Sequence, residues 1–197
     1  ELNNLAIIST LSIEIVDGEY QIGAQVMNAQ KQGASGSGSN GSDNTPVVVF
    51  KYKGKTIHEA LRKMTTETPK KLYFGHISMI MISDNAAKEG FKEISDFLIR
   101  DHETRKQFKV MIIRNDEVDK GLTLLSHLES SPSQENLDIL NAASSYYGNV
   151  SVVNFDEFLS FDYAEGVEPI LPYADLIGDV DEGKKKESSE QTVPATF

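Results

Sequence analysis

The 197-residue sequence contains no cysteine. A fold without cysteine needs no disulfide and cannot hold a metal ion through thiolates, and no residue of this sequence can carry a lipid on cysteine. The sequence also lacks a run of about 18 consecutive apolar residues, the length that a membrane-spanning helix requires. It begins at Glu1 without a methionine or a basic and apolar leader, so we expect a processed segment whose signal peptide has been removed.

The usual signatures of catalysis are missing as well. The sequence has no Gly-x-Ser-x-Gly elbow and, without cysteine, no thiol nucleophile. Residues 33–38 contain closely spaced glycines, but the lysine and the helix of a phosphate-binding loop do not follow them. No two histidines have the i, i+4 spacing of a helical zinc site; the four are His58, His76, His102 and His127. The sequence therefore predicts no enzyme, no cofactor and no metal site.

The net charge of the chain and the distribution of its lysines and arginines limit which kinds of partner it can bind. The formal net charge is −11 and the sequence pI is about 4.8, so the chain repels a phosphate backbone and we expect no nucleic-acid binding. One stretch is basic, opposed in sequence only by Glu59 and Glu67. Its cationic residues are Lys51, Lys53, Lys55, Arg62, Lys63, Lys70 and Lys71. This stretch is either a solvated face or a surface that docks on anionic lipid or on an acidic partner.

The first half of the sequence predicts paired strands followed by a helix. Residues 5–15 and 20–27 are rich in β-formers and flank Asp17-Gly18, which is a hairpin signal. Residues 31–45 predict a flexible Gly/Ser loop, and residues 47–50 resume the strand pattern. Thr56 and Glu59 predict a helix that begins with a capping box and ends at Pro69.

The middle of the chain predicts buried strands that alternate with helices. Residues 72–83 are nearly apolar on both faces from Ile77 onward, which places a strand in the centre of the sheet. His76 falls inside that strand, either as a satisfied core histidine or as a group that senses protons or contacts a ligand. Asp84 is expected to cap a short helical turn closed by Gly90, with a second helix over residues 91–100 and another buried strand over residues 108–113.

Short helices and a polar tail are expected after residue 115. We predict helices over residues 118–128 and 134–147, and a further helix that begins with an Asn154 and Glu157 capping box. The whole pattern predicts an α/β or α+β fold, a mixed β-sheet with helices packed on it. We expect one domain over residues 1–178 and a polar linker, or the start of the next domain, over residues 179–197.

Five segments, in this order, resemble the Ger(x)C family of spore germination lipoproteins. They are residues 1–8, 54–62, 70–76, 96–105 and 167–172. His102 stands where proline is common in the family. Because the same segments contain the caps, strands and prolines that a stable domain needs, we expect the matching positions to determine the fold rather than form a site. These positions are Tyr73, Gly75, His76, Arg100, Arg105 and Pro172.

The resemblance implies a non-catalytic C subunit of a spore nutrient germinant receptor. Such subunits act with A and B subunits in receptor assembly or signal relay during spore germination. They are held by an N-terminal lipid on the outer face of the spore's inner membrane, although the lipidated cysteine lies outside this sequence. Two alternatives stay open: a domain that binds a small-molecule germinant directly, and a hydrolase in which His76 or His102 meets carboxylates.

Overall fold

The computed structural model describes most of the predicted domain. The described residues are 5–27, 47–68, 70–101, 104–114, 118–123, 137–138, 140–147 and 151–175. The predicted Gly/Ser loop at 31–45, the predicted linker at 179–197, His102 and His127 lie outside them. The domain boundary at residue 178 therefore stays a prediction.

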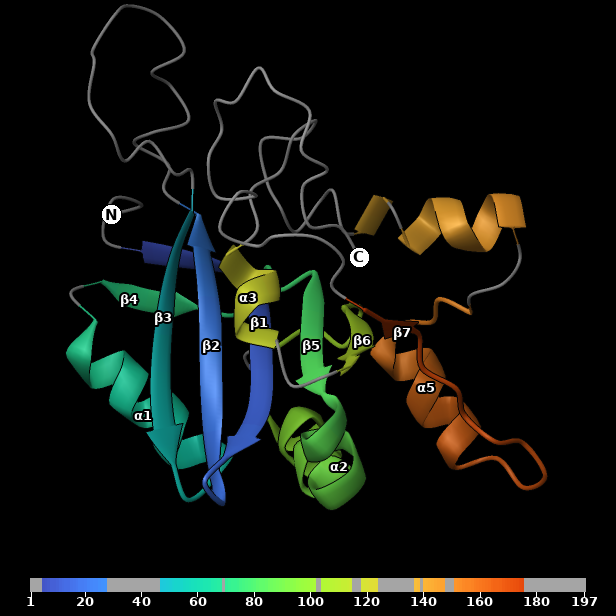
Figure 1. Cartoon of the computed structure of the whole chain (residues 1–197), viewed down its shortest axis with the longest axis horizontal. Helices are drawn as coiled ribbons and strands as arrows, with labels where there is room; N and C mark the ends of the chain where they lie inside the picture. The colour runs from blue at the N-terminus through green and yellow to red at the C-terminus, as the bar shows by residue number, and fades with distance from the viewer. Residues whose placement is uncertain are drawn as a thin grey trace, which may run out of the picture.

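The core of the structure is a seven-stranded mixed sheet in the order β3-β2-β1-β5-β6-β7, with β4 paired to β1 (Figure 1). The strands are β1 Leu5–Val16, β2 Glu19–Met27, β3 Val47–Gly54, β4 Lys71–Tyr73, β5 Met79–Ser83, β6 Lys109–Ile113 and β7 Tyr173–Ala174. The helices are α1 Ile57–Glu67, α2 Asp84–Arg100, α3 Val118–Thr123, a π-helical turn at Ala143–Tyr147 and α5 Phe155–Asp162. The predicted α/β class, a mixed sheet with helices packed on it, is confirmed.

The predicted hairpin joins β1 to β2. Asp17 and Gly18 both have positive φ angles (57° and 78°), and Val16 lies opposite Glu19 across the turn. Two consecutive positive φ angles match the right-handed twist of paired strands, which is why Asp-Gly is favoured there. The hairpin prediction is confirmed, and β3 continues it as an antiparallel neighbour of β2.

The prediction of one continuous strand over residues 72–83 is wrong. Leu5–Ile7 of β1 pair with β4, and β1 then pairs with β5 from Thr10↔Met79 onward. Between these two pairings β1 advances from Ile7 to Thr10 while the partner advances from Tyr73 to Met79, so the extra residues form a turn. The interruption coincides with a register shift of β1 between Ile8 and Thr10 against β2. His76 consequently lies exposed in a turn and not in the central strand.

The helix after β5 also differs in detail from its prediction. Its N-cap is Ser83, whose Oγ accepts a hydrogen bond from Ala86 N–H (3.1 Å), and not Asp84. Gly90 has non-helical angles (φ −145°, ψ 23°), so it divides α2 at a kink into a short first segment and a second segment that continues to Arg100, as predicted. The predicted helix after Asn154 is confirmed as α5, and Glu157 accepts a hydrogen bond from Asn154 N–H (2.7 Å).

The sheet is covered on both faces, as the apolar β5 strand indicates. Ile80 and Ile82 belong to a large core that includes buried residues of α1, α2 and α5. Met79 and Met81 belong to a second core, which Val118 and Leu122 of α3 cover from the opposite face. Alternate residues of one strand therefore anchor the two layers. Among the described residues, none of the helices combines the length and apolarity that a bilayer crossing demands.

Candidate functional site: the basic surface of β3, α1 and β4

The structure gathers the predicted basic stretch at one end of the sheet. Lys51 and Lys53 lie on the edge strand β3, Lys55 in the following turn, and Arg62 and Lys63 on α1. Lys70 and Lys71 lie at the start of β4, which Figure 1 places at the same end of the molecule. We call these seven residues the basic surface. All are exposed except Lys53, which is half-buried.

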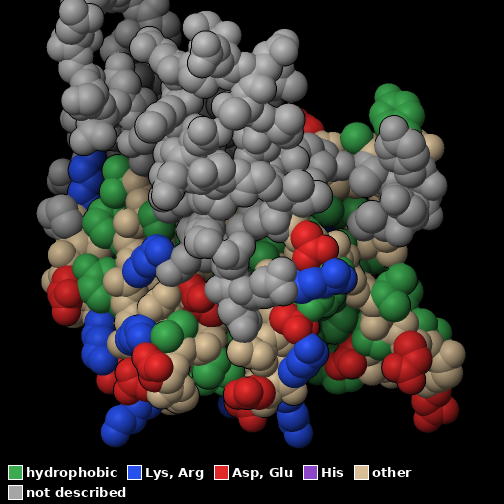
Figure 2. Space-filling view, viewed as in Figure 1, with side chains coloured by type: hydrophobic (Ala, Val, Ile, Leu, Met, Phe, Trp, Pro, Cys, Tyr) green, Lys and Arg blue, Asp and Glu red, His purple; other side chains and the backbone are tan. Residues whose placement is uncertain are grey.

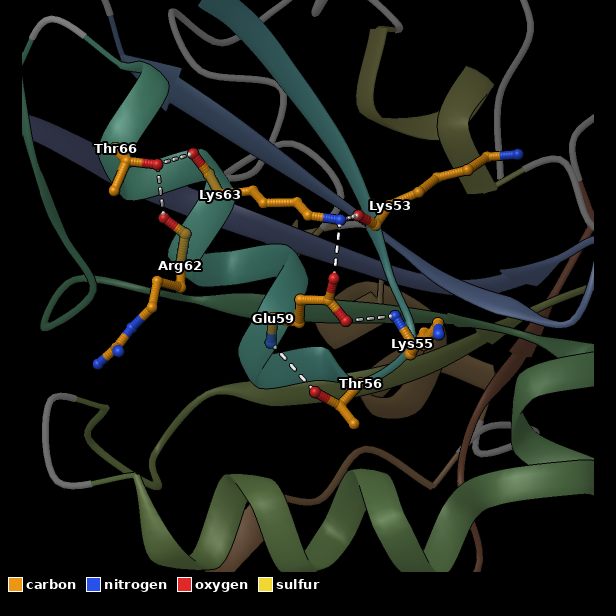
Figure 3. Close-up of polar contacts among 7 residues, drawn as sticks. All are labelled: Lys53, Lys55, Thr56, Glu59, Arg62, Lys63 and Thr66. Atoms are coloured by element: carbon orange, nitrogen blue, oxygen red, sulfur yellow. Dashed lines mark hydrogen bonds and ion pairs between the residues drawn. The ribbon is translucent and has the colours of Figure 1, made fainter.

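Glu59 on α1 connects α1 with the end of β3 and the turn that follows it (Figure 3). Glu59 Oε1 lies 2.9 Å from Lys63 Nζ, and Lys63 Nζ also donates to the carbonyl oxygen of Lys53 (3.0 Å). Glu59 Oε2 accepts a hydrogen bond from Lys55 N–H (2.9 Å), while Glu59 N–H donates to Thr56 Oγ1 (3.2 Å). The predicted capping box is thus modified: the carboxylate reaches the amide of Lys55 and not that of the N-cap residue.

Electrostatics follow from these contacts. The pKa of Glu59 is lowered by hydrogen bonds from Lys63 and from the backbone of Lys55, and the pKa of Lys63 is raised, mainly by its hydrogen bond to Glu59. Lys53 is paired with Asp17 across the hairpin (3.3 Å). The charges of Lys53 and Lys63 are therefore partly neutralised by carboxylates of this domain, so these two lysines should attract an acidic partner less strongly.

Four cations of the basic surface make no ion pair within the part of the chain that the structure describes. They are Lys55, Arg62, Lys70 and Lys71. Figure 3 shows the Arg62 side chain extending away from the Glu59 network. Lysines on an edge strand also discourage pairing with other strands, so Lys51 and Lys53 have a structural reason to be there. The unpaired cations are the better candidates for a partner.

The residues of the family-like segments make several different contacts. The Tyr73 and His76 rings lie 5.5 Å apart, and a Cβ added at Gly75 would meet Tyr73 Oη at 2.7 Å. Arg100 pairs with Asp96 (2.8 Å), and the buried Pro172 accepts a hydrogen bond from Ile112 N–H (2.9 Å). Arg105 is exposed. Their interpretation as fold determinants stays a prediction.

Sequence reasoning missed a charged cluster at the carboxyl ends of the parallel strands. Asp84 follows β5, Arg114 follows β6 and Asp175 follows β7. Arg114 Nη1 lies 3.1 Å from Asp175 Oδ2, and its guanidinium lies 4.8 Å from the centre of the Tyr173 ring. Lys88 pairs with Asp84. The detectable signal was a charged residue directly after each of three strands, because parallel strands end at one edge of a sheet.

This carboxyl-edge cluster is largely self-neutralising. Hydrogen bonds from Lys88 and Tyr173 lower the pKa of Asp84, and the hydrogen bond to Asp84 raises the pKa of Tyr173. Asp175 Oδ1 is buried without a hydrogen-bond partner among the described residues. The cluster contains no histidine. Of the two described histidines, His58 contacts the Phe97 ring and His76 the Tyr73 ring, and no group of histidines and carboxylates in the described ranges could hold a metal ion.

Comparison with known proteins places the domain in a family. The family described as spore germination protein N-terminal domain matches residues 1–176. The chain belongs to this family. Spore germination protein KC of Bacillus subtilis (strain 168) is 30% identical over 196 residues, which cover 98% of this chain and 48% of the relative. The putative spore germination protein YfkR of the same organism is 23% identical over 120 residues, or 60% of this chain and 31% of the relative.

The chain therefore spans about half the length of the first of these spore germination proteins and less of the second. No solved structure matches. The family match covers both the basic surface and the carboxyl-edge cluster, since it ends one residue after Asp175. The resemblance drawn from the five segments is confirmed, and the chain is a spore germination protein N-terminal domain.

Proposed function

We propose that this spore germination domain is a non-catalytic binding module of a nutrient germinant receptor, and that it acts in receptor assembly or signal relay through the basic surface. The observation that carries the proposal is the concentration of seven cations at one end of a chain whose net charge is −11. Such a charge distribution favours encounter with an acidic surface and orients the approach.

The proposed partners are the A and B subunits of the receptor. The proposed location is the outer face of the spore's inner membrane, with a lipid anchor supplied by the full-length protein. Family membership supports the receptor setting, and the four unpaired cations support a protein or lipid partner of negative charge. A modest contribution from each exposed charge, about 1 kcal/mol or less, means that several must act together.

Charge reversal tests the proposal. In the full-length protein in spores, Arg62→Glu with Lys70→Glu is expected to lower crosslinking to receptor subunits about tenfold at low ionic strength, and less at high salt because salt screens exposed charges. The matched control is Lys92→Glu with Lys106→Glu, since Lys92 is exposed, Lys106 is half-buried, neither belongs to the basic surface and the net charge changes equally. Equal losses in the two variants, or no loss in either, would contradict a specific role for the basic surface.

Direct binding of a small-molecule germinant is the second candidate, favoured by the carboxyl-edge cluster, because open α/β sheets bind ligands at that edge. A thermal-shift screen with amino acids, sugars and nucleosides separates the two. A true ligand at 100 times its Kd would raise the melting temperature by roughly 5 °C or more, and Arg114→Ala would abolish the shift. The assembly role predicts no shift with any compound.

A further inference from the structure

A second surface of the molecule carries apolar and acidic side chains together. Among the described residues eight large hydrophobic side chains are exposed, and five of them fall between residues 161 and 173. These five are Phe161 (42% exposed), Tyr163 (74%), Val167 (48%), Ile170 (60%) and Tyr173 (43%). Single exposed hydrophobic residues are ordinary, whereas a concentration in one segment marks an interaction site. We call α5 and the following residues up to Tyr173 the acidic–apolar surface.

The same segment has charge of only one sign. Residues 155–173 contain five carboxylates and no lysine, arginine or histidine. Asp162, Glu165 and Glu168 are exposed and make no ion pair within the described part of the chain. Figure 2 shows acidic side chains directly beside hydrophobic ones at the lower right of the molecule, the end that α5 occupies in Figure 1.

The acidic–apolar surface is presented by a well-packed scaffold. Phe155 and Phe158 are buried under α5, and Phe155 stacks on Phe108 of the core at 5.1 Å between ring centres. Beyond α5 the chain reverses through Gly166 (φ 82°) and is fixed again where Pro172 accepts the hydrogen bond from Ile112 N–H. Side chains held between two anchored ends lose little conformational entropy on binding, which suits aromatic anchors.

The charge of the molecule is therefore polarised between its two ends. Residues 51–71 contain seven cations and two glutamates, a net charge of +5, and residues 155–173 have a net charge of −5. Figure 1 shows α1 and α5 at opposite ends of the sheet. An acidic surface favours a cationic partner surface, so the acidic–apolar surface is suited to a partner surface opposite in sign to the one that the basic surface would bind.

We propose that the acidic–apolar surface docks on a separate protein through a cationic surface that contains apolar pockets. Tyr163 and Ile170 are the anchors, because they are the most exposed hydrophobic residues of the surface. Glu165 and Glu168 lie between them in sequence and repel anionic lipid while they attract lysine and arginine. This inference goes beyond the proposed function and does not depend on the basic surface.

Photocrosslinking with the full-length protein in spores tests this second surface. A photoreactive phenylalanine analogue in place of Tyr163 or Ile170 is expected to give the same protein adduct, with the captured peptide containing lysine or arginine next to apolar residues. Glu165→Lys with Glu168→Lys is expected to reduce the adduct from either position at least about tenfold, because attraction becomes repulsion. Glu89→Lys with Glu93→Lys, exposed carboxylates of α2, is the matched control and should leave the adduct unchanged.

The outcomes separate this inference from the proposed function. Arg62→Glu with Lys70→Glu should weaken contacts of the basic surface and leave the adducts from Tyr163 and Ile170 intact. Adducts with lipid, with a second copy of this chain or with a peptide lacking basic residues would overturn the inference. The absence of any adduct from both positions, in protein that folds normally by circular dichroism, would overturn it as well.

Discussion

Gly54→Ala is expected to lower the free energy of unfolding by about 3 kcal/mol, as overpacking against fixed atoms does. An added Cβ at this position would lie 2.6 Å from the backbone nitrogen of Ala60 and 3.0 Å from the carbonyl oxygen of Thr56. Neither atom can rotate away, because Ala60 is fully buried and belongs to the first turns of α1. Equilibrium unfolding in urea, read as a shift of the midpoint at constant slope, measures the loss.

Gly166→Ala is the matched control for this effect. Gly166 has a positive φ of 82° and nothing within 4 Å of an added Cβ, so alanine there meets backbone strain without a clash. The expected loss is about 1 kcal/mol. If Gly54→Ala lowered the free energy of unfolding no more than Gly166→Ala, the junction between β3 and α1 would relax to accommodate the added Cβ. The close contact with the Ala60 backbone would then contribute little to stability.

Phe155→Ala is expected to be the other severe substitution. It should lower the free energy of unfolding by about 4 kcal/mol, because it leaves an empty cavity in the core. Phe155 is 1% exposed and stacks on Phe108, and Phe158 on the next turn contacts the Phe91 ring of α2 at 5.3 Å. Removal of the Phe155 ring takes away the stacking partner of both Phe108 and Phe158. Chemical denaturation with far-UV circular dichroism measures the loss.

Phe161→Ala supplies the comparison within the same helix. The side chain is 42% exposed, so its truncation should change the free energy of unfolding by only about 0.5 kcal/mol. If Phe161→Ala proved as destabilising as Phe155→Ala, Phe161 would belong to the core, and its assignment to the acidic–apolar surface would fail.

The sequence predicted well those features that depend on neighbouring residues. Asp17-Gly18 dictates its turn through the positive φ angles that only a few residues tolerate, and Thr56 and Glu59 define a helix start within four residues. The division between β4 and β5 was not predicted, because Gly75 and His76 do not by themselves end a strand and the residues from Ile77 onward are nearly all apolar. Only the pairing with a distant strand, which is irregular between Ile8 and Thr10, decides where the second strand begins.

In the candidate sites too, contacts between residues close in sequence were predictable, whereas contacts between distant residues were not. The cations of residues 51–71 were evident from composition, and the pair of Glu59 and Lys63 has the i, i+4 spacing of helical ion pairs. The contact of Lys53 with Asp17 depends on the register between β2 and β3, which composition does not reveal. Arg114 and Asp175 meet only because β6 and β7 are neighbours in the sheet, although the two residues lie 61 positions apart in sequence.

The central position of β1 imposes an order on folding. Its antiparallel neighbour β2 follows at once, so that pairing closes a very short loop, whereas Thr10 must find Met79 and β5 must then find β6. Long-range parallel pairings are slow to form, because the entropy of loop closure is lost before contacts compensate for it. A nascent chain can thus complete the hairpin early, but one edge of its central strand stays open to wrong pairing until residue 83 has been synthesised.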